Sequence, residues 1–81
     1  MRCVTYILRS EKSGTYYRGS CENLEQRLAE HNAGRVRSTR AAAPWVVQYA
    51  EEFTTRGDAI RRERFFKTRS GYRWLKRKGI I

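Results

Sequence analysis

The sequence predicts a single domain of the α+β class, with its elements in the order β-β-α-β-α-α. Three observations predict this class. Segments rich in β-forming residues are expected to be strands: residues 3–9, 15–19 and 45–50. Segments with helical periodicity are expected to be helices: residues 24–32, 56–68 and 72–78. The chain has 81 residues, of which 40% are hydrophobic, so we expect one small core and one domain over residues 1–81.

Local signals set the expected boundaries of these elements. Residues 11–14 form a polar turn that ends in glycine, so the first two strands should pair as a hairpin. Asn23, with Gln26 three positions later, is typical of a helix start, and residues 32–34 are typical of its end. Residues 33–43 have no clear period, so we expect a basic loop before the third strand.

The second half of the chain carries similar signals. Residues 54–55 are two threonines that can cap the helix expected over residues 56–68, and Ser70 and Gly71 are expected to break it. The last helix could dock on the core through Tyr72 and Leu75, which are three positions apart and lie on one helical face. We expect no repeat, linker or second domain within these 81 residues.

Charge points to a polyanionic partner. The chain has 18 Lys and Arg against 8 Asp and Glu, a formal net charge of +10. A positive charge of this size attracts polyanions, and nucleic acid is the leading candidate for the partner. The alternatives are an anionic membrane as the partner, or a charged surface that is solvated and has no such partner. No stretch approaches the roughly 20 apolar residues of a membrane span. We expect a cytoplasmic protein, without a signal peptide, in which Cys3 and Cys21 are reduced thiols.

Three polar side chains are predicted to lie on apolar helix faces. At 100° per residue, Arg27 and His31 share the face of Leu24 and Leu28 in the first helix. Glu63 shares the inner face of the helix over residues 56–68, whereas Glu25, Gln26 and Glu30 are expected to point outward. Burying an unpaired charge is costly, so an inward carboxylate needs an arginine, a metal ion or a cleft.

Two interpretations fit these inward polar residues. In the first, Arg27 and Glu63 form a buried ion pair and His31 caps a carbonyl group. In the second, which we favour, the three belong to a metal-assisted phosphodiester hydrolase, in which a carboxylate holds the cation, an arginine neutralises the transition state and a third group handles protons. Tyr6 and Tyr17, on opposite arms of the hairpin, gain catalytic meaning only beside these helix residues.

The spacing of these residues resembles that of the GIY-YIG nuclease superfamily, and in particular its small single-domain members. Val4-Thr5-Tyr6 stands at the first triplet and Tyr17-Arg18-Gly19 at the second. Arg27 matches the family arginine, His31 the position four residues later, and Glu63 the metal-binding glutamate. The resemblance covers essentially the whole chain.

This resemblance implies a fold and an activity. The fold is a three-stranded antiparallel sheet flanked by helices, with a shallow site across the face of the sheet. By resemblance, Glu63 binds one Mg²⁺ or Mn²⁺, Arg27 holds the scissile phosphate, either Tyr6 or Tyr17 activates or positions the attacking water, and His31 assists proton transfer. A hard cation held by one carboxylate, waters and phosphate oxygens is chemically reasonable.

Further basic residues are expected to follow the nucleic-acid backbone and to set affinity rather than sequence choice. The candidates are Arg18, Arg35, Arg37, Arg40 and Arg69. We therefore expect a metal-dependent endonuclease that prefers DNA to RNA and is structure-selective or weakly sequence-selective. A homodimer or a protein partner would have to supply high specificity. The alternatives are a non-catalytic nucleic-acid-binding module and an accessory subunit that retains the nuclease fold.

Overall fold

The computed structural model describes residues 2–81 and has the predicted order of elements. These are β1 (Cys3–Ser10), β2 (Tyr16–Cys21), α1 (Leu24–Asn32), the 3-10 helix η1 (Arg40–Ala42), β3 (Trp45–Phe53), α2 (Arg56–Phe66) and α3 (Arg69–Arg77). The α+β class and the antiparallel three-stranded sheet are therefore confirmed.

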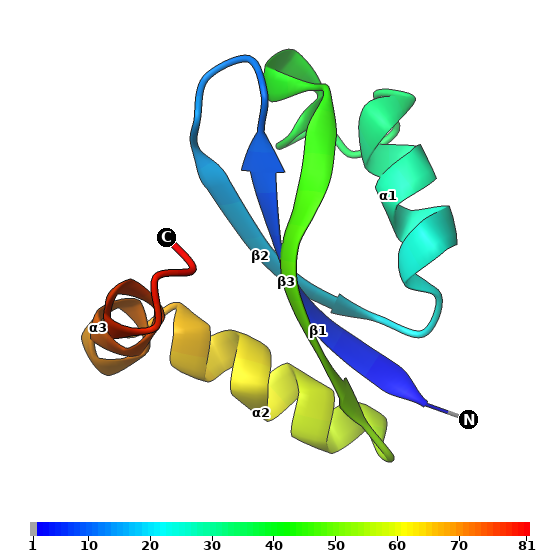
Figure 1. Cartoon of the computed structure of the whole chain (residues 1–81). Helices are drawn as coiled ribbons and strands as arrows, with labels where there is room; N and C mark the ends of the chain where they lie inside the picture. Colours follow the sequence, from blue (N-terminus) through cyan, green and yellow to red (C-terminus); the bar gives the residue numbers. More distant parts are fainter. Residues whose placement is uncertain (1) are drawn as a thin grey trace.

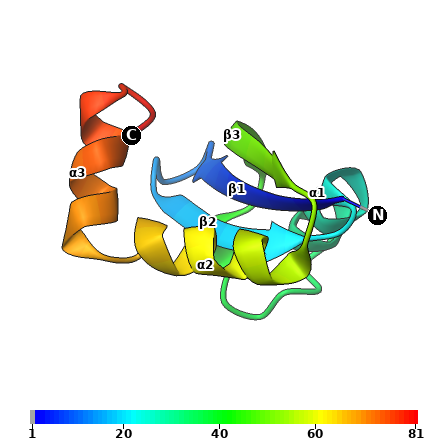
Figure 2. The same ribbon diagram turned by 90° about the horizontal axis from the view of Figure 1, so that it is seen from below.

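The sheet has the strand order β2-β1-β3, so β1 is central and β2 is an edge strand. Helix α1 covers one face, and α2 and α3 lie against the other (Figures 1 and 2). Each face of the sheet has its own hydrophobic core, and successive residues of β1 contribute to the two cores in turn. Tyr6 and Leu8 pack with α1, whereas Ile7 packs with Phe66 and Leu75. Because both its faces are covered, β1 is buried along most of its length.

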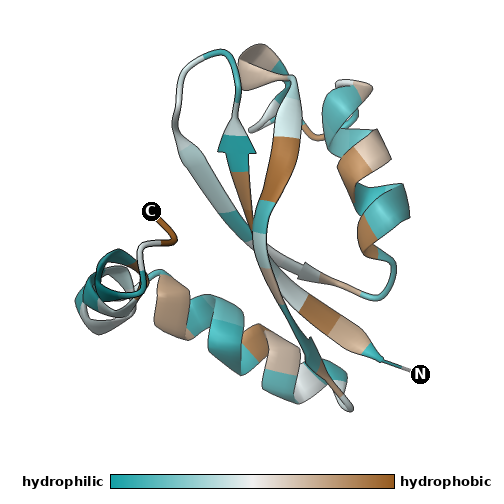
Figure 3. Ribbon diagram, in the orientation of Figure 1, coloured by the Kyte–Doolittle hydropathy of each residue, from teal (hydrophilic) through white to brown (hydrophobic). Residues whose placement is uncertain are grey.

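Figure 3 shows the same division by hydropathy, with hydrophobic stretches on the strands and on α1, and hydrophilic residues over most of α3. Trp45, at the start of β3, is buried as expected. Cys3 and Cys21 are free cysteines. None of the helices in residues 2–81 combines the length and apolar character that a membrane crossing requires.

The capping predictions are confirmed. The Asn23 side chain accepts the N–H of Gln26 at 3.1 Å, and α1 ends at Asn32, two residues before Gly34, whose φ is +78°. Thr55 caps α2 by accepting the N–H of Asp58. Each signal acts within one helical turn, which is why the sequence reveals it.

The predicted helix break at Ser70 and Gly71 is wrong. Helix α2 ends at Phe66, and α3 starts after Thr68, whose hydroxyl accepts the N–H of Gly71 at 3.1 Å. Gly71 therefore lies inside α3, where it permits close packing: an added Cβ would lie 1.8 Å from the Phe65 carbonyl oxygen.

The expected docking of Tyr72 is also wrong, although that of Leu75 is confirmed. Leu75 is fully buried, whereas Tyr72 remains 47% exposed. The buried stripe of α3 runs through Gly71 and Leu75, one helical turn apart, and Tyr72 lies about 100° away from Gly71 around the helix axis. The last helix therefore presents an aromatic ring to solvent.

Smaller corrections concern element ends. The second strand is residues 16–21 rather than 15–19, and the third extends to Phe53 rather than to residue 50. The loop expected over residues 33–43 contains η1. The pairing of β1 with β3 shifts by one residue between Ile7 and Leu8, and this irregularity has no separate signal in the sequence.

Candidate active site

Three aromatic side chains meet on the face of the sheet that α1 covers. The ring centroids of Tyr6 and Tyr17 are 6.3 Å apart, and those of Tyr17 and His31 are 4.9 Å apart. Gly19, paired with Tyr6 across the β1–β2 ladder, makes this possible. A Cβ at Gly19 would lie 2.5 Å from the Tyr6 hydroxyl oxygen and 3.1 Å from Cε2 of Tyr17. Because the glycine of the second triplet has no side chain, both tyrosine rings can pack against its α-carbon.

A buried hydrogen-bonded chain runs from Tyr6 through His31 to Thr39. The Tyr6 hydroxyl lies 3.1 Å from Nε2 of His31, and Nδ1 lies 2.7 Å from Oγ1 of Thr39. Oγ1 of Thr39 donates to the Val36 carbonyl oxygen at 3.3 Å. Because a carbonyl group only accepts, Thr39 is left to accept from Nδ1–H, and Nε2 accepts from Tyr6.

The ionisation of this chain follows from its burial. Burial raises the pKa of the Tyr6 hydroxyl to about 12, against the opposing effect of the neighbouring Arg27 guanidinium. Burial also lowers the pKa of His31, and the positive charge of Arg27 acts in the same direction. At neutral pH, Tyr6 is therefore a protonated hydrogen-bond donor and His31 a neutral imidazole. Both are essentially inaccessible to solvent, whereas Tyr17 is half-buried.

The end of α1 is fixed to the start of β3 by residues that we did not predict as part of the site. Asn32 accepts the N–H of Trp45 at 2.6 Å and donates to its carbonyl group at 3.0 Å. The indole N–H of Trp45 donates to the Thr39 carbonyl oxygen at 2.8 Å. These bonds fix the positions of His31 and Thr39 relative to each other. Their only sequence signal was the family resemblance, which covers essentially the whole chain.

Arg27 lies at the exposed margin of the same face. Its guanidinium pairs with Glu30 at 3.0 Å, and its side chain is 37% exposed. The buried ion pair between Arg27 and Glu63, the alternative interpretation, is not formed, because Glu63 pairs with Lys67 instead. Glu30, expected to point outward, is instead partly covered by this contact. Arg27 therefore lies near the Tyr6 hydroxyl and keeps part of its side chain open to a ligand.

Glu63 approaches from the opposite face of the sheet. It lies on α2, and its Oε1 accepts the hydroxyl of Ser20 at 2.6 Å. Its Oε2 pairs with the Lys67 ammonium at 2.8 Å, and the Glu63 side chain is 21% exposed. The predicted inward position is therefore confirmed, but the contacts are with the edge strand and with one turn of its own helix.

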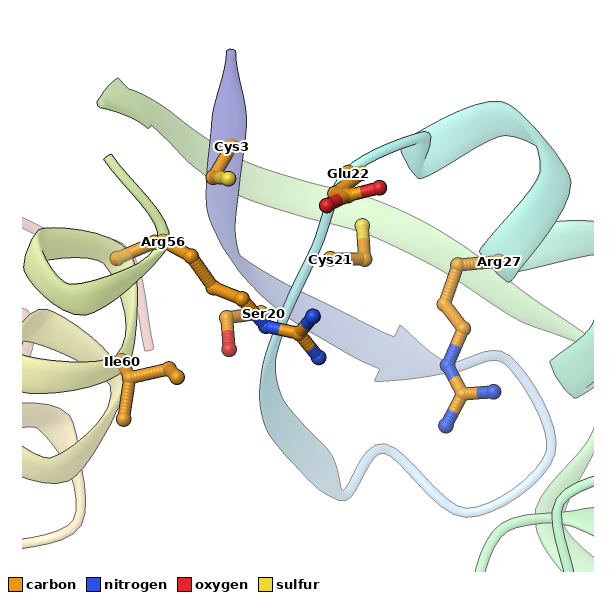
Figure 4. A pocket seen from close by; sticks show the side chains of 8 residues that line it. Cys3, Ser20, Cys21, Glu22, Arg27, Arg56 and Ile60 are labelled. Atoms are coloured by element: carbon orange, nitrogen blue, oxygen red, sulfur yellow. The ribbon is translucent and has the colours of Figure 1, made fainter. Parts of the chain in front are cut away.

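A pocket of about 350 Å³ joins the two faces around edge strand β2. Arg27 borders it from α1, Arg56 borders it from α2, and Ser20 and Cys21 come from β2 itself (Figure 4). Because the Ser20 hydroxyl binds Glu63, the carboxylate adjoins the pocket. The resemblance implied a site across one face of the sheet, whereas these candidate groups lie around one edge of it. Arg56 was not predicted as a site residue, because its position at the pocket depends on where α2 crosses β2.

The sequence of the chain also matches a known protein family. The model of the GIY-YIG catalytic domain family matches residues 2–76. The chain belongs to the GIY-YIG family. Membership places it among nucleases that generally use a divalent metal ion and act on nucleic acid.

Relatives share most of this domain. A UPF0213 protein from Staphylococcus haemolyticus is 39% identical over 72 residues, which are 88% of this chain and 87% of that protein. One from Bacillus licheniformis is 41% identical over 63 residues, which are 76% of this chain but only 64% of that protein. The solution structure of the UPF0213 protein from Bacillus halodurans is 26% identical, with a TM-score of 0.55 over 93% of this chain and 82% of that one.

The residues at the pocket are compatible with the metal use of the GIY-YIG family. Within residues 2–81, no three His, Cys, Asp or Glu side chains form a ready metal cage. Mg²⁺ needs no such cage, because it keeps several waters and binds through one or two carboxylates and substrate phosphates. Glu63, partly exposed beside the pocket, supplies one such carboxylate. Lys67, itself 54% exposed, is a weakly held partner that a stronger cation could displace.

The arginines predicted to bind nucleic acid do not form one patch. Arg35, Arg37 and Arg40 are exposed in the segment between α1 and β3, and Arg69 is exposed at the start of α3. Arg18 points from β2 toward α3 and lines a second pocket. The GIY-YIG domain therefore offers basic side chains on both sides of the β2 edge.

Proposed function

We propose that this GIY-YIG domain is a metal-dependent endonuclease that hydrolyses phosphodiester bonds in DNA. One observation carries the proposal: Arg27 lines a pocket at the edge of the sheet, and Ser20 in the same lining donates a hydrogen bond to the partly exposed carboxylate of Glu63. The net charge of +10 supports a polyanionic substrate. Hydrolysis adds water across one phosphorus–oxygen bond, which leaves a phosphate on one product and a hydroxyl group on the other.

Arg27 is proposed to hold the scissile phosphate and to neutralise the charge that develops on it. Its fixed guanidinium fork suits phosphate oxygens. Glu63 is proposed to hold the Mg²⁺ or Mn²⁺, which when bound would neutralise phosphate charge and make a coordinated water more acidic. Arg56, on the other side of the pocket, is a further phosphate contact.

The two tyrosines are proposed to have different roles. Tyr17 is half-buried and can reach a substrate, so we assign to it the positioning of the attacking water. Tyr6 is 1% exposed and donates to His31, which makes it a positioning residue that orients Tyr17 and Arg27. His31 then acts on protons only through Tyr6, because no part of its side chain is exposed.

Selectivity should depend on the shape of the substrate more than on its sequence. The proposed contacts are arginines facing phosphates, which position a nucleic acid without reading its bases. DNA is favoured over RNA, and a second copy or a protein partner would supply any strong sequence preference. We place this activity in the cytoplasm.

The direct test is a cleavage assay with supercoiled, branched and single-stranded DNA in Mg²⁺ or Mn²⁺. We expect the wild-type chain to cut at least one substrate, and Arg27→Ala and Glu63→Ala to be slower by about 100-fold or more. Glu25→Ala is the matched control, since Glu25 is an exposed glutamate of α1 outside the pocket. Equal rates in all four proteins would defeat the proposal.

One observation favours a second candidate, a non-catalytic binding module. Both oxygens of Glu63 are already engaged, by Ser20 and by Lys67. If that arrangement is permanent, the chain should bind DNA equally well in EDTA and in Mg²⁺, with no cutting and no loss of binding in Glu63→Ala. Metal-dependent cutting by the wild type would exclude this candidate.

A further inference from the structure

A second pocket, of about 300 Å³, lies between β2 and α3 and outside the candidate active site. Its lining residues are Thr15, Tyr16, Arg18, Tyr72, Lys76 and Ile81. The set combines two aromatic rings with two cationic side chains and contains no carboxylate side chain. This combination suits a ligand that has both a flat apolar face and negative charge.

Tyr72 is the most unusual member, because its ring is 47% exposed although the helical pattern predicted it to be core. The ammonium group of Lys76 lies 5.9 Å from the centre of that ring, within reach of a cation–π contact. The ring is therefore held beside a positive charge with much of its surface open to a partner.

Arg18 supplies a second charge with unused bonding capacity. Its Nε is buried and has no hydrogen-bond partner within residues 2–81. A buried donor without a partner is costly, and a ligand oxygen would remove that cost once the Arg18 side chain shifts to expose Nε. The surroundings add to the attraction, because residues 67–81 contain six Lys and Arg and no Asp or Glu.

The second pocket is also connected to the candidate active site along β2. Arg18 and Ser20 point to the same face of the strand, two residues and about 7 Å apart. Ser20 binds Glu63 and lines the first pocket. A single nucleic-acid chain that runs along β2 is therefore able to reach both pockets.

We infer that the pocket between β2 and α3 binds a nucleotide of a single-stranded segment, with its base on Tyr72 and its phosphate at Arg18 and Lys76. The ligand must be unpaired, because the faces of paired bases are stacked inside a duplex. Every base has such a face, so the contact tolerates any sequence. This inference rests on the proposed function for its choice of nucleic acid, and it names single-stranded flaps or ends as the substrate class.

The test is binding to a fluorescein-labelled oligothymidylate of about twelve nucleotides, and to a duplex of equal length, by anisotropy in EDTA. We expect Tyr72→Ala to weaken single-strand binding about 5- to 100-fold and to leave duplex binding nearly unchanged. Tyr72→Phe, which keeps the ring, should bind like the wild type. Lys76→Ala should weaken single-strand binding more than Arg73→Ala, a matched change on α3 outside the pocket.

Three outcomes would overturn the inference. The first is equal binding of the oligonucleotide by Tyr72→Ala and the wild type, and the second is an equal loss of binding for single strand and duplex. The third is an effect of Tyr72→Ala only on binding to phosphatidylserine vesicles, which would make the surface a membrane contact. Because no metal is present, the result does not depend on cleavage. Intact binding without metal-dependent cutting would count against the proposed nuclease alone.

Discussion

At Gly19, the α-carbon lies against the rings of Tyr6 and Tyr17. A methyl group there would meet the Tyr6 hydroxyl oxygen at 2.5 Å, so that ring would have to move. We expect Gly19→Ala to lose at least about tenfold in cleavage rate, because small displacements of catalytic groups are costly. Overpacking should also lower the free energy of unfolding by about 1–3 kcal/mol in urea denaturation.

Gly57 provides the control for this substitution. A Cβ at Gly57 would meet only the Arg61 guanidinium nitrogens, at 3.8 Å, which is ordinary contact. Gly57→Ala should keep its cleavage rate and gain slightly in stability, since alanine favours helices. Wild-type activity in Gly19→Ala would show that the placement of the tyrosine rings does not matter for the reaction.

His31 should make the stability of the fold depend on pH. Burial lowers its pKa below the ordinary 6.5, so the unfolded chain binds more protons than the folded chain between the lowered pKa and 6.5. Stability therefore rises with pH through that interval and gains nothing more from His31 above it. The carboxyl groups of Glu30 and Asp58 have pKa values lowered by hydrogen bonds from Arg27 and Arg61, so both groups stay charged through this interval.

The measurement is urea denaturation at about pH 5.5 and about pH 7.5, for the wild type and for His31→Gln. The wild type should be less stable at the lower pH. Because His31 is the single histidine of the chain, the variant should show a smaller difference. The same difference in both proteins would contradict the assignment of the pH effect to the buried imidazole.

Among the elements, the junction of α2 and α3 depends on Gly71. Its α-carbon packs on the last turn of α2, and an added Cβ would lie 1.8 Å from a backbone oxygen that cannot turn aside. We expect Gly71→Ala to separate the helices and to destabilise the fold by about 3 kcal/mol or more, measured by urea denaturation. Ser70→Ala, on the exposed neighbour, should change stability little. A Gly71→Ala protein as stable as Ser70→Ala would contradict the packing described for α3.

The elements also show what sequence patterns can and cannot reveal. Strand and helix identities, and the caps at Asn23 and Thr55, depend on neighbours within a few residues and were predicted. Gly71 was misread as a helix breaker because a glycine that permits close packing looks the same in sequence. Tyr72 was misplaced because periodicity locates an apolar stripe only to within about one residue.

At the scale of the whole molecule, the site depends on topology. The helical periodicity correctly predicted that Glu63 lies on the inner face of α2. It did not indicate which face of the sheet α2 covers. It therefore did not reveal that Glu63 would meet Ser20 at an edge strand, or that Arg56 would join the pocket. The family resemblance named Tyr6, Tyr17 and His31 as site candidates, but it did not indicate that Thr39 would bind the imidazole of His31.

The charge of the whole molecule leads to a salt dependence. With a net charge of +10, binding of single-stranded DNA should release counterions from the phosphates that the basic side chains neutralise. With about four such contacts, log K should fall with log salt concentration at a slope of about −3. Anisotropy titrations in EDTA at several salt concentrations measure this slope. A slope near zero would contradict electrostatic recognition of the backbone.

The central claim is that groups from the two faces of the sheet act together at the β2 edge. The most direct test is a double-mutant cycle on the single-turnover rate of DNA cleavage, with Arg27→Ala, Glu63→Ala and the double variant. Residues that act as one unit are strongly non-additive, so the double variant should be about as slow as the slower single variant. Effects that multiply, or cleavage that neither substitution slows, would contradict the claim.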